Sequence, residues 1–271
     1  MLITYVTVTY NAASVLQRTL DSVLAQDYPD IVHLIIDGAS TDGTLEMVNS
    51  YIEHSNESGN GHRIQVMSEP DKGIYDAMNK GLRSLDGDYV CFLNAGDFLP
   101  SPNTVSRIAE QFKASSGRRT LATNGTQDSS QFKDPAVLYG DTDIVDGEGR
   151  FLHHRRLAPP ENLTWKSFRH GMLVCHQAFY ARTDFAIATP YDQHYRYSAD
   201  VDWCIRIMKA AEKENIPLHN LHMVVANYTE EGQTTLHHRE SLWERFHIMT
   251  HHYGWLTTIA MHLWFVVRPR K

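Results

Sequence analysis

Apolar segments with strand and helix periods alternate through the first hundred residues, and this alternation limits the fold more than any other feature of the chain. Segments rich in β-branched residues predict strands, and segments with apolar residues three and four apart predict helices between them. Such a β-α-β-α order predicts an α/β protein with a mostly parallel sheet and helices on both faces. The expected strands are Leu2–Thr9, Val32–Ile36, Ile64–Met67 and Tyr89–Leu93, and the expected helices include Thr44–Ile52 and Ile74–Leu85.

The remainder of the chain gives a less regular pattern. Polar, turn-rich stretches predict loops at Ser55–His62 and Lys113–Pro135. Short strands are expected at Val137–Tyr139 and Met172–Tyr180. The further expected helices are Ser101–Phe112, Ala199–Glu214 and most of Leu236–Val267.

Polar residues follow each of the four predicted strands. They are Thr9-Tyr10-Asn11, then Asp37, then Glu69-Pro70-Asp71, and finally Asn94-Ala95-Gly96-Asp97. In open parallel sheets, ligands bind beyond the carboxyl ends of the strands. The sequence therefore predicts a binding site at this edge of the sheet.

Charge and length narrow the classes of function. The chain has 271 residues, with 25 Lys and Arg against 32 Asp and Glu, so its formal net charge is -7. A nucleic-acid partner is not expected, because neutralising phosphates requires a basic face. The length suits one large domain or two tightly joined halves. The 16 His make the charge sensitive to pH near neutrality, but their spacing predicts no zinc site.

The cysteines and the two ends of the chain bear on its location. Cys91, Cys175 and Cys204 each lie in an apolar run, which predicts buried thiols in a reducing compartment. The first residues do not resemble a signal peptide. Trp255–Val267 is apolar but too short to span a bilayer comfortably, and basic residues follow it through Lys271. This segment is either a core helix or an interfacial helix whose basic end meets anionic lipid.

Several sequence motifs together resemble those of family-2 glycosyltransferases of the GT-A fold. The motifs are TVTYN, IIDGASTDGT and ADVDWCIR, and the stretches SEPDKGIYDAMNKG and FLNAGD are similar to those of polysaccharide-building members of the colanic-acid type. The resemblance covers roughly residues 1–235. It implies a Rossmann-like sheet, with 1–100 as the nucleotide-sugar-binding half and 101–235 as the acceptor-binding half. Residues 236–271 would form a helical C-terminal segment that either packs on the core or associates with a membrane.

The resemblance also implies an activity. The chain is expected to be an inverting glycosyltransferase of the hexosyltransferase type. It would move a sugar from a nucleotide-diphosphate sugar to a hydroxyl of a saccharide or lipid-linked acceptor, in bacterial polysaccharide biosynthesis. The expected location is the cytoplasm, including the inner face of the cell membrane. Two rivals remain open: a sugar-nucleotide nucleotidyltransferase, and a non-catalytic nucleotide- or metal-binding protein. The first should carry a Gly-rich loop with Arg or Lys after its first strand, which Thr9–Ser14 is not.

The resemblance assigns donor-binding roles to residues after the first two strands. Thr9, Tyr10 and Asn11 would line the base and ribose, where an aromatic ring can stack on the base. Asp37 stands where the family carries paired acids, and its carboxylate would accept a hydrogen bond from a pyrimidine. The alternatives are ordinary turn chemistry for Asn11, and capping of the following turn by Asp37 and Ser40.

Four more donor-site residues are expected around the third helix. Asp71 and Lys72 precede it, and Lys72 would face the diphosphate at a helix N-terminus, where the dipole also favours an anion. Asp76 and Asn79 are three residues apart, so both can face the cleft. The alternative for the helix residues is a solvated surface.

The segment Asn94-Ala95-Gly96-Asp97 matches the place of the family's metal motif, with Gly96 in place of one acid. Asp97 is therefore the acid expected to reach a divalent cation, Mg²⁺ or Mn²⁺, that bridges the diphosphate. Asn94, Ala95 and Gly96 would border the donor. Asp141 and Asp143 form a second acidic pair that could face the acceptor, but Asp97 is preferred.

The resemblance places the acceptor side later in the chain. Asp200 aligns with the catalytic base, Asp202 and Trp203 would wall the acceptor site, and Arg206 would pair with an acid of the same helix. The alternative is that Ser198, Asp200 and Asp202 merely cap the helix. His176 and Gln177 would line the acceptor side, although a His in an apolar strand is more often a core residue. His237 or His238 could complete a metal shell, and the role of Glu231–Thr234 is left open.

Overall fold

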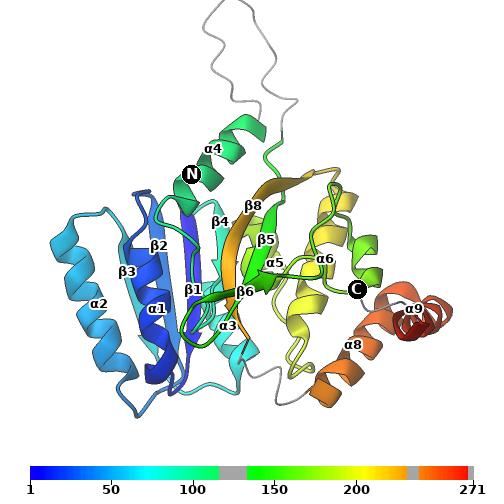
Figure 1. The fold of residues 1–271 in the computed structure, drawn as a ribbon, viewed down its shortest axis with the longest axis horizontal. Helices are drawn as coiled ribbons and strands as arrows, with labels where there is room; N and C mark the ends of the chain where they lie inside the picture. The colour runs from blue at the N-terminus through cyan, green and yellow to red at the C-terminus, as the bar shows by residue number, and fades with distance from the viewer. Residues whose placement is uncertain (116–132, 231–237, 268–271) are drawn as a thin grey trace, which may run out of the picture.

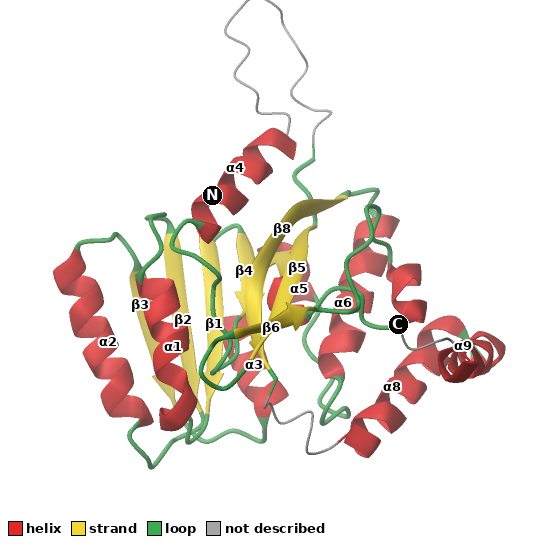
Figure 2. Cartoon of the chain, in the orientation of Figure 1, coloured by secondary structure: helices red, strands yellow, loops and turns green. Residues whose placement is uncertain are grey.

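The fold is a single mixed sheet with helices on both faces, as seen in a computed structural model that describes residues 1–115, 133–230 and 238–267. The sheet has eight strands in the order β3-β2-β1-β4-β7-β5-β6, and β8 pairs with β5 (Figures 1 and 2). The strands are β1 (Ile3–Thr9), β2 (Ile31–Asp37), β3 (Arg63–Ser68), β4 (Tyr89–Phe92), β5 (Val137–Val145), β6 (Phe151–His154), β7 (Phe179–Arg182) and β8 (Leu218–Thr229).

The first four strands are parallel, as the sequence pattern predicts. Register places Thr9 of β1 opposite Asp37 of β2, so the polar residues after these strands begin at one edge. Ile35 packs with buried residues of α1 (Ala13–Leu24) and α2 (Thr44–Ser58). Leu34 and Ile36 belong to the main core together with residues of α3 (Ile74–Arg83). Neighbouring strand residues point to opposite faces, so helices cover both sides and the predicted fold class is confirmed.

The second half extends the sheet with antiparallel pairs. β7 pairs antiparallel with β4 and β5, and β6 pairs antiparallel with β5. Two strands of this half, β6 and β8, are not predicted by the sequence pattern. Seven of the twelve β8 residues are only partly buried or exposed, so its apolar run is short. The helices here are α4 (Thr104–Ser115), α5 (Thr183–Ala188) and α6 (Ala199–Lys213), with short 3₁₀ turns at Trp165–His170 and His176–Ala178.

Three predicted boundaries are wrong. The polar residues 55–58, expected as the start of a loop, continue α2 until Gly59, whose φ of 62° ends the helix in the left-handed conformation. β5 is nine residues long because pairing with β8 continues it to Val145. Met172–Tyr180 is not one strand, since a 3₁₀ turn at His176–Ala178 precedes β7.

Two helices form the C-terminal part of the described chain, at the end of the molecule opposite α2 (Figure 1). They are α8 (His238–Tyr253) and α9 (Trp255–Val267), separated at Gly254, whose φ is 81°. Within the described ranges, no helix combines the length and apolar character that crossing a membrane requires. The predicted roles of Glu231–Thr234 and His237, and most of the predicted loop Lys113–Pro135, fall outside the described residues, as do residues 268–271.

Candidate active site

A cleft of about 1380 Å³ opens at the carboxyl ends of β1 and β4. One wall consists of residues after those strands, together with the start of α3. The facing wall comes from the His176–Ala178 turn, the start of α6, the end of β8, and α8. The sequence-predicted residues that line this cleft are Thr9, Tyr10, Asn11, Asp71, Asn94, Ala95, Gly96, Asp97, His176, Gln177 and Asp200.

The residues after β1 form a fixed, accessible ledge. Tyr10 is 67% exposed within the cleft. Asn11 has a φ of 48°, and its side-chain oxygen accepts a hydrogen bond from Thr41 N at 2.9 Å. A Cβ on Gly38 would lie 2.5 Å from Asp71 Oδ2 and 3.2 Å from Tyr10 Cδ2. Glycine at position 38 therefore allows Tyr10 and Asp71 to approach each other at the mouth of the cleft.

Asp37 is fully buried, and it is absent from the described lining of the cleft. Its carboxylate accepts hydrogen bonds from Thr9 Oγ1 at 3.0 Å and Ser68 Oγ at 2.7 Å, and from Ser40 N at 2.9 Å. Burial opposes ionisation, but these hydrogen bonds outweigh it and hold the pKa of Asp37 below its usual range. Asp37 thus fixes three neighbouring segments behind the ledge.

Of the four donor-site residues expected around α3, the structure places one in the described lining of the cleft and three outside it. Asp71 lines the cleft and accepts a hydrogen bond from Gly73 N at 2.8 Å. Lys72 is exposed, and neither it nor Asp76 is among the described lining residues. Asp76 accepts a hydrogen bond from Lys72 N at 3.0 Å, which ties the first turn of α3 to the loop before it. Asn79 is buried and braces the backbone of Tyr191 through two hydrogen bonds of 2.9 and 2.7 Å.

The turn Asn94–Asp97 is held from two sides. Gly96 has a φ of 98°, and its N donates to Thr19 Oγ1 of α1 at 2.9 Å. From the other side, Thr229 at the end of β8 donates through Oγ1 to Gly96 O at 2.7 Å. Because α1 and β8 lie far apart in the sequence, this turn is fixed only when both halves of the chain pack together.

Asp97 is 5% exposed, and both of its carboxylate oxygens are hydrogen-bonded. Oδ1 accepts from Thr229 N at 3.0 Å and Oδ2 from Gln177 Nε2 at 2.6 Å. Burial raises the pKa of Asp97 to about 7, against the opposing effect of these hydrogen bonds. The carboxylate is thus held in position by neutral donors, and among the described residues it has no ion-pair partner.

The residues at this turn fit a divalent cation as part of its shell. Asn94 Oδ1 is a buried side-chain oxygen with no hydrogen-bond partner in the described chain, and Asp97 offers a carboxylate that lacks a compensating charge. Oxygen ligands suit Mg²⁺ and Mn²⁺, which commonly take one or two protein ligands together with substrate phosphates and water. The described residues include no cluster of three or more His, Cys, Asp or Glu that could hold a metal by themselves.

Asp200 lies at the start of α6, where the helix dipole favours a carboxylate. Its Oδ1 accepts a hydrogen bond from Tyr75 OH at 3.2 Å, and its Oδ2 lies 3.8 Å from His176 Nδ1. His176 is buried, which lowers the pKa of its imidazole, while Asp200 opposes that shift. Helix α3 through Tyr75, the 3₁₀ turn through His176, and α6 itself therefore position this carboxylate at the cleft.

Asp202 and Trp203, expected as walls of the acceptor site, lie in the interior instead. Asp202 is 4% exposed and is bonded to Arg206 Nε at 2.6 Å and His252 Nε2 at 2.8 Å. Burial opposes ionisation of Asp202, but His252 and Arg206 lower its pKa overall. Trp203 is fully buried and stacks on Tyr191 with ring centroids 4.9 Å apart. Two residues along an α-helix turn the side-chain direction by about 200°, so Asp200 meets the cleft while Asp202 faces α8.

Several cleft residues are not anticipated from the sequence. Tyr75 lies in the stretch SEPDKGIYDAMNKG but has no role assigned from it, Thr229 belongs to no motif, and the pattern around β8 is too weak to predict a strand. Asp141 and Asp143 are absent from the described lining, and Asp143 instead contacts His154 Nδ1 at 2.7 Å. The described lining also includes four arginines, Arg18, Arg155, Arg196 and Arg245.

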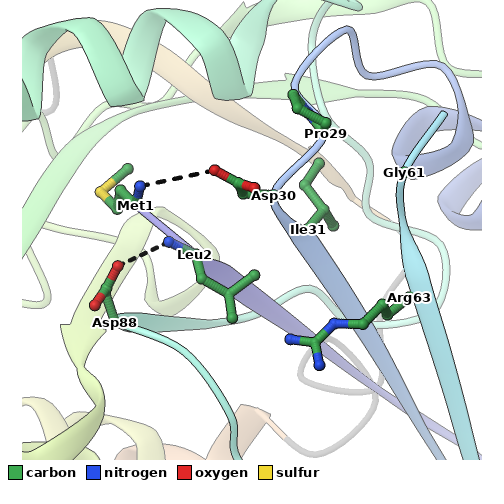
Figure 3. Close-up of a pocket in the computed structure, with 8 residues that line it drawn as sticks. All are labelled: Met1, Leu2, Pro29, Asp30, Ile31, Gly61, Arg63 and Asp88. Carbon is green, nitrogen blue, oxygen red and sulfur yellow. Dashed lines mark hydrogen bonds and ion pairs between the residues drawn. The ribbon is translucent and has the colours of Figure 1, made fainter.

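A second, smaller hollow of about 380 Å³ lies at the other end of β1 and β2. The Met1 amino group faces Asp30 at 3.9 Å, and Leu2 N donates to Asp88 at 2.8 Å (Figure 3). Arg63, which also lines it, is paired with Asp86 at 2.8 Å. The large cleft is therefore the stronger candidate for a substrate site.

Comparison with known proteins assigns the family. The family described as "Glycosyl transferase family 2" matches residues 4–186. The chain belongs to this family. A curated relative, the PGL/p-HBAD biosynthesis glycosyltransferase of Mycobacterium bovis, is 32% identical over 225 residues, which cover 83% of this chain and 75% of the relative. The chain is therefore a glycosyltransferase.

Solved structures bear out the fold of this glycosyltransferase. Residues 1–349 of Staphylococcus aureus TarS, in complex with UDP-GlcNAc, superpose with a TM-score of 0.65 at 17% identity, covering 92% of this chain and 64% of that one. The mannosyltransferase PcManGT from Pyrobaculum calidifontis, in complex with GDP-Man and Mn²⁺, gives a TM-score of 0.56 at 16% identity, covering 98% and 76%. The chain thus has the GT-A fold and spans just under two thirds of that TarS chain.

Proposed function

We propose that this glycosyltransferase inverts configuration as it moves a sugar from a nucleotide-diphosphate sugar to a hydroxyl of a saccharide or lipid-linked acceptor. One observation carries the proposal: a single cleft is lined both by the ledge after β1 and β4 and by Asp200 at the start of α6. The solved neighbours hold nucleotide sugars, namely UDP-GlcNAc in TarS and GDP-Man in PcManGT. This supports a donor of that class here.

The donor would occupy the wall formed by residues 1–100. Tyr10 offers an exposed ring on which a base can stack, and Thr9 and Asn11 border it. Asp37 would act behind them by holding Thr9 and Ser40 in place. Asp71, next to Tyr10, would meet the nucleoside at the mouth of the cleft.

Asp200 would serve as the general base on the acceptor side. It would take the proton from the acceptor hydroxyl as that oxygen forms a bond to the anomeric carbon. The bond from the anomeric carbon to the diphosphate oxygen breaks on the opposite face, the nucleoside diphosphate leaves with the electron pair, and the configuration inverts. Tyr75 OH and His176 would keep the carboxylate aimed at the acceptor.

Asp97 and Asn94 would hold a Mg²⁺ or Mn²⁺ ion, which when bound neutralises charge on the diphosphate. The chain's own contribution is the geometry of these oxygens. Gln177 and Thr229 fix the two oxygens of Asp97, and Thr19 fixes the turn through Gly96. Gln177 would thus act on the donor side through Asp97.

The substitution Asp200→Asn tests the base. The amide keeps the size of the side chain and can still accept from Tyr75, but it cannot take a proton. We expect the rate of sugar transfer to fall by about 10²- to 10⁴-fold, the range typical of general-base catalysis. Thermal shift with UDP and with GDP should give the same response as in the wild type, because Asp200 does not contact the donor in this assignment. Transfer at near-wild-type turnover would exclude Asp200 as the base.

We also propose that α8 and α9 make peripheral contact with an anionic membrane surface, which would bring the enzyme to a lipid-linked acceptor. Trp243 on α8 is 66% exposed and Leu256 on α9 is 84% exposed. The sequence continues from α9 with Arg268, Arg270 and Lys271. Exposed apolar side chains next to basic residues suit an interfacial helix. Truncation after Tyr253 should reduce sedimentation with anionic vesicles, and unchanged sedimentation would count against this contact.

A further inference from the structure

The cleft holds positive charge that the proposed donor chemistry does not use. Two of its four arginines are engaged with main-chain carbonyls. Arg18 donates to Gly147 O at 2.8 Å, and Arg155 donates to Leu157 O and Met172 O, each at 2.6 Å. These two guanidinium groups hold the loops around β6 in place; Arg155 bonds three carbonyls, and Arg18 also lies 5.4 Å from the centroid of the Phe98 ring.

The other two arginines, Arg196 and Arg245, are differently placed. Neither forms an ion pair within the described part of the chain, although both line the cleft. Arg245 Nε is buried and has no hydrogen-bond partner among the described residues. Leaving a buried N–H donor without an acceptor is costly, and because Arg245 as a whole is only partly buried, its side chain stays open to an anion in the cleft.

One carboxylate joins the two chain segments that carry these arginines. Glu244, the residue before Arg245 on α8, accepts hydrogen bonds from Arg196 N at 2.7 Å and Tyr197 N at 2.8 Å. It thereby ties the segment before α6, which carries Arg196, to α8, which carries Arg245, and both arginines line the same cleft. Both Glu244 oxygens are bonded to backbone N–H groups, so the carboxylate is engaged in this tether.

We propose that Arg196 and Arg245 form a subsite for an anionic group, a carboxylate or a phosphate, on the acceptor. This rests on the proposed function. Guanidinium groups bind both kinds of anion with paired hydrogen bonds. In an acidic protein of net charge -7, two such groups within the cleft provide local selection for a charged acceptor.

The position of the pair favours the acceptor over the donor. Arg196 lies four residues before Asp200 in the chain, on the segment that leads into α6. Arg245 lies on α8, the helix that also buries the other face of α6 through His252 and Asp202. The donor ledge after β1 and β4 belongs to the opposite wall. An anion held by these arginines would therefore lie on the side of the proposed base.

Three probes of one shape separate charge from size: p-nitrophenyl β-glucoside, the corresponding glucuronide, and the glucoside 6-phosphate. Binding of each is measured by calorimetry on the full-length protein, with and without UDP or GDP. We expect the wild type to bind at least one anionic probe about tenfold more tightly than the neutral one, as befits charge-assisted hydrogen bonds. The glucuronide and phosphate arms tell which anion is preferred.

The variants Arg196→Gln and Arg245→Gln should each remove most of that preference and leave the affinity for the neutral probe and for the nucleotide within about twofold. Arg239→Gln is the matched control, since Arg239 is an exposed arginine on the same helix that does not line the cleft. It should keep the full preference.

Three results would overturn the subsite: no preference for either anionic probe in the wild type, an equal loss with Arg239→Gln, or a matching loss of nucleotide affinity in the two variants. The last result would assign the arginines to the donor diphosphate. Donor hydrolysis measured on the same wild-type preparation tests the proposed function separately. Hydrolysis without any anion preference would reject the subsite alone, and an anion preference without nucleotide binding or hydrolysis would reject the proposed function.

Discussion

The two walls of the cleft are built in different ways. The donor wall comes from short segments that directly follow the parallel strands β1 and β4, so each segment is placed by the strand that precedes it. The facing wall collects a 3₁₀ turn, the segment before α6, the end of β8 and a turn of α8. Strand ends that the sequence pattern already indicates locate the first wall, although Thr229 of β8 must still fix its Asn94–Asp97 turn, whereas the second wall depends on long-range packing throughout.

The largest effect is expected at Asp97, where the two walls of the cleft meet. The substitution Asp97→Asn preserves the hydrogen bond from Thr229 N to Oδ1 but removes the carboxylate charge. We expect the rate of sugar transfer to fall by about 10³-fold, as for loss of a group that stabilises developing charge. Transfer assays over a Mn²⁺ and Mg²⁺ titration measure this. Rates within tenfold of the wild type would show that the cation does not depend on Asp97.

The next effect concerns the packing of the acceptor wall. Asp202→Ala leaves the buried His252 and the half-buried Arg206 without their shared carboxylate. Removing one partner of a buried pair typically lowers the free energy of unfolding by about 3 kcal/mol. Urea denaturation measures it. The control Asp143→Ala removes an acid bonded to the exposed His154 and should cost less than about 1 kcal/mol. Equal losses would mean that the tie between α6 and α8 contributes little.

A third test concerns the stability of the sheet behind the donor wall, through the buried His33. His33 on β2 is fully buried between Thr7 and Tyr51, and burial lowers its pKa from 6.5 to about 3. Below pH 6.5 the unfolded chain binds a proton that the folded protein excludes, so stability falls as pH falls through this range. By pH 5 we expect His33 to have reduced the free energy of unfolding by about 2 kcal/mol relative to pH 7.

The comparison of wild type with His33→Gln isolates this contribution, since the amide retains hydrogen-bonding capacity and does not titrate. The variant should lose less stability between pH 7 and pH 5 than the wild type does. Parallel pH profiles for the two proteins would place the acid sensitivity elsewhere in the molecule.

The smallest effect probes the mouth of the donor wall alone. In Gly38→Ala the new Cβ would meet Asp71 Oδ2 and Tyr10 Cδ2, so both side chains must move. We expect nucleotide affinity to fall by about tenfold, equivalent to about 1.4 kcal/mol. Calorimetry with UDP and GDP measures this. Binding of the anionic probes at Arg196 and Arg245 should stay unchanged, and a loss at both walls would show that they do not act independently.

Much of the donor wall could be predicted because its geometry is periodic. Parallel strands place their carboxyl ends at one edge, so Thr9–Asn11 and Asn94–Asp97 could be assigned to one site from their positions alone. Two other residues of this region could not be placed correctly from the sequence. Asp37 and Asn79 have the right chemistry and spacing but face the interior, because neighbouring segments supply partners for their polar atoms.

The sequence by itself determined the α/β class, the family and the segments from which the donor wall is made. Only the tertiary structure decided that Asp200 reaches the cleft while Asp202 is buried against His252. It also decided that Thr229 holds Asp97, and that Glu244 ties the segment carrying Arg196 to α8. The physical reason is the range of the interactions. Hydrophobic periodicity and turn chemistry act between residues close in sequence, whereas these contacts join residues up to 132 positions apart and form only after the sheet and helices have packed.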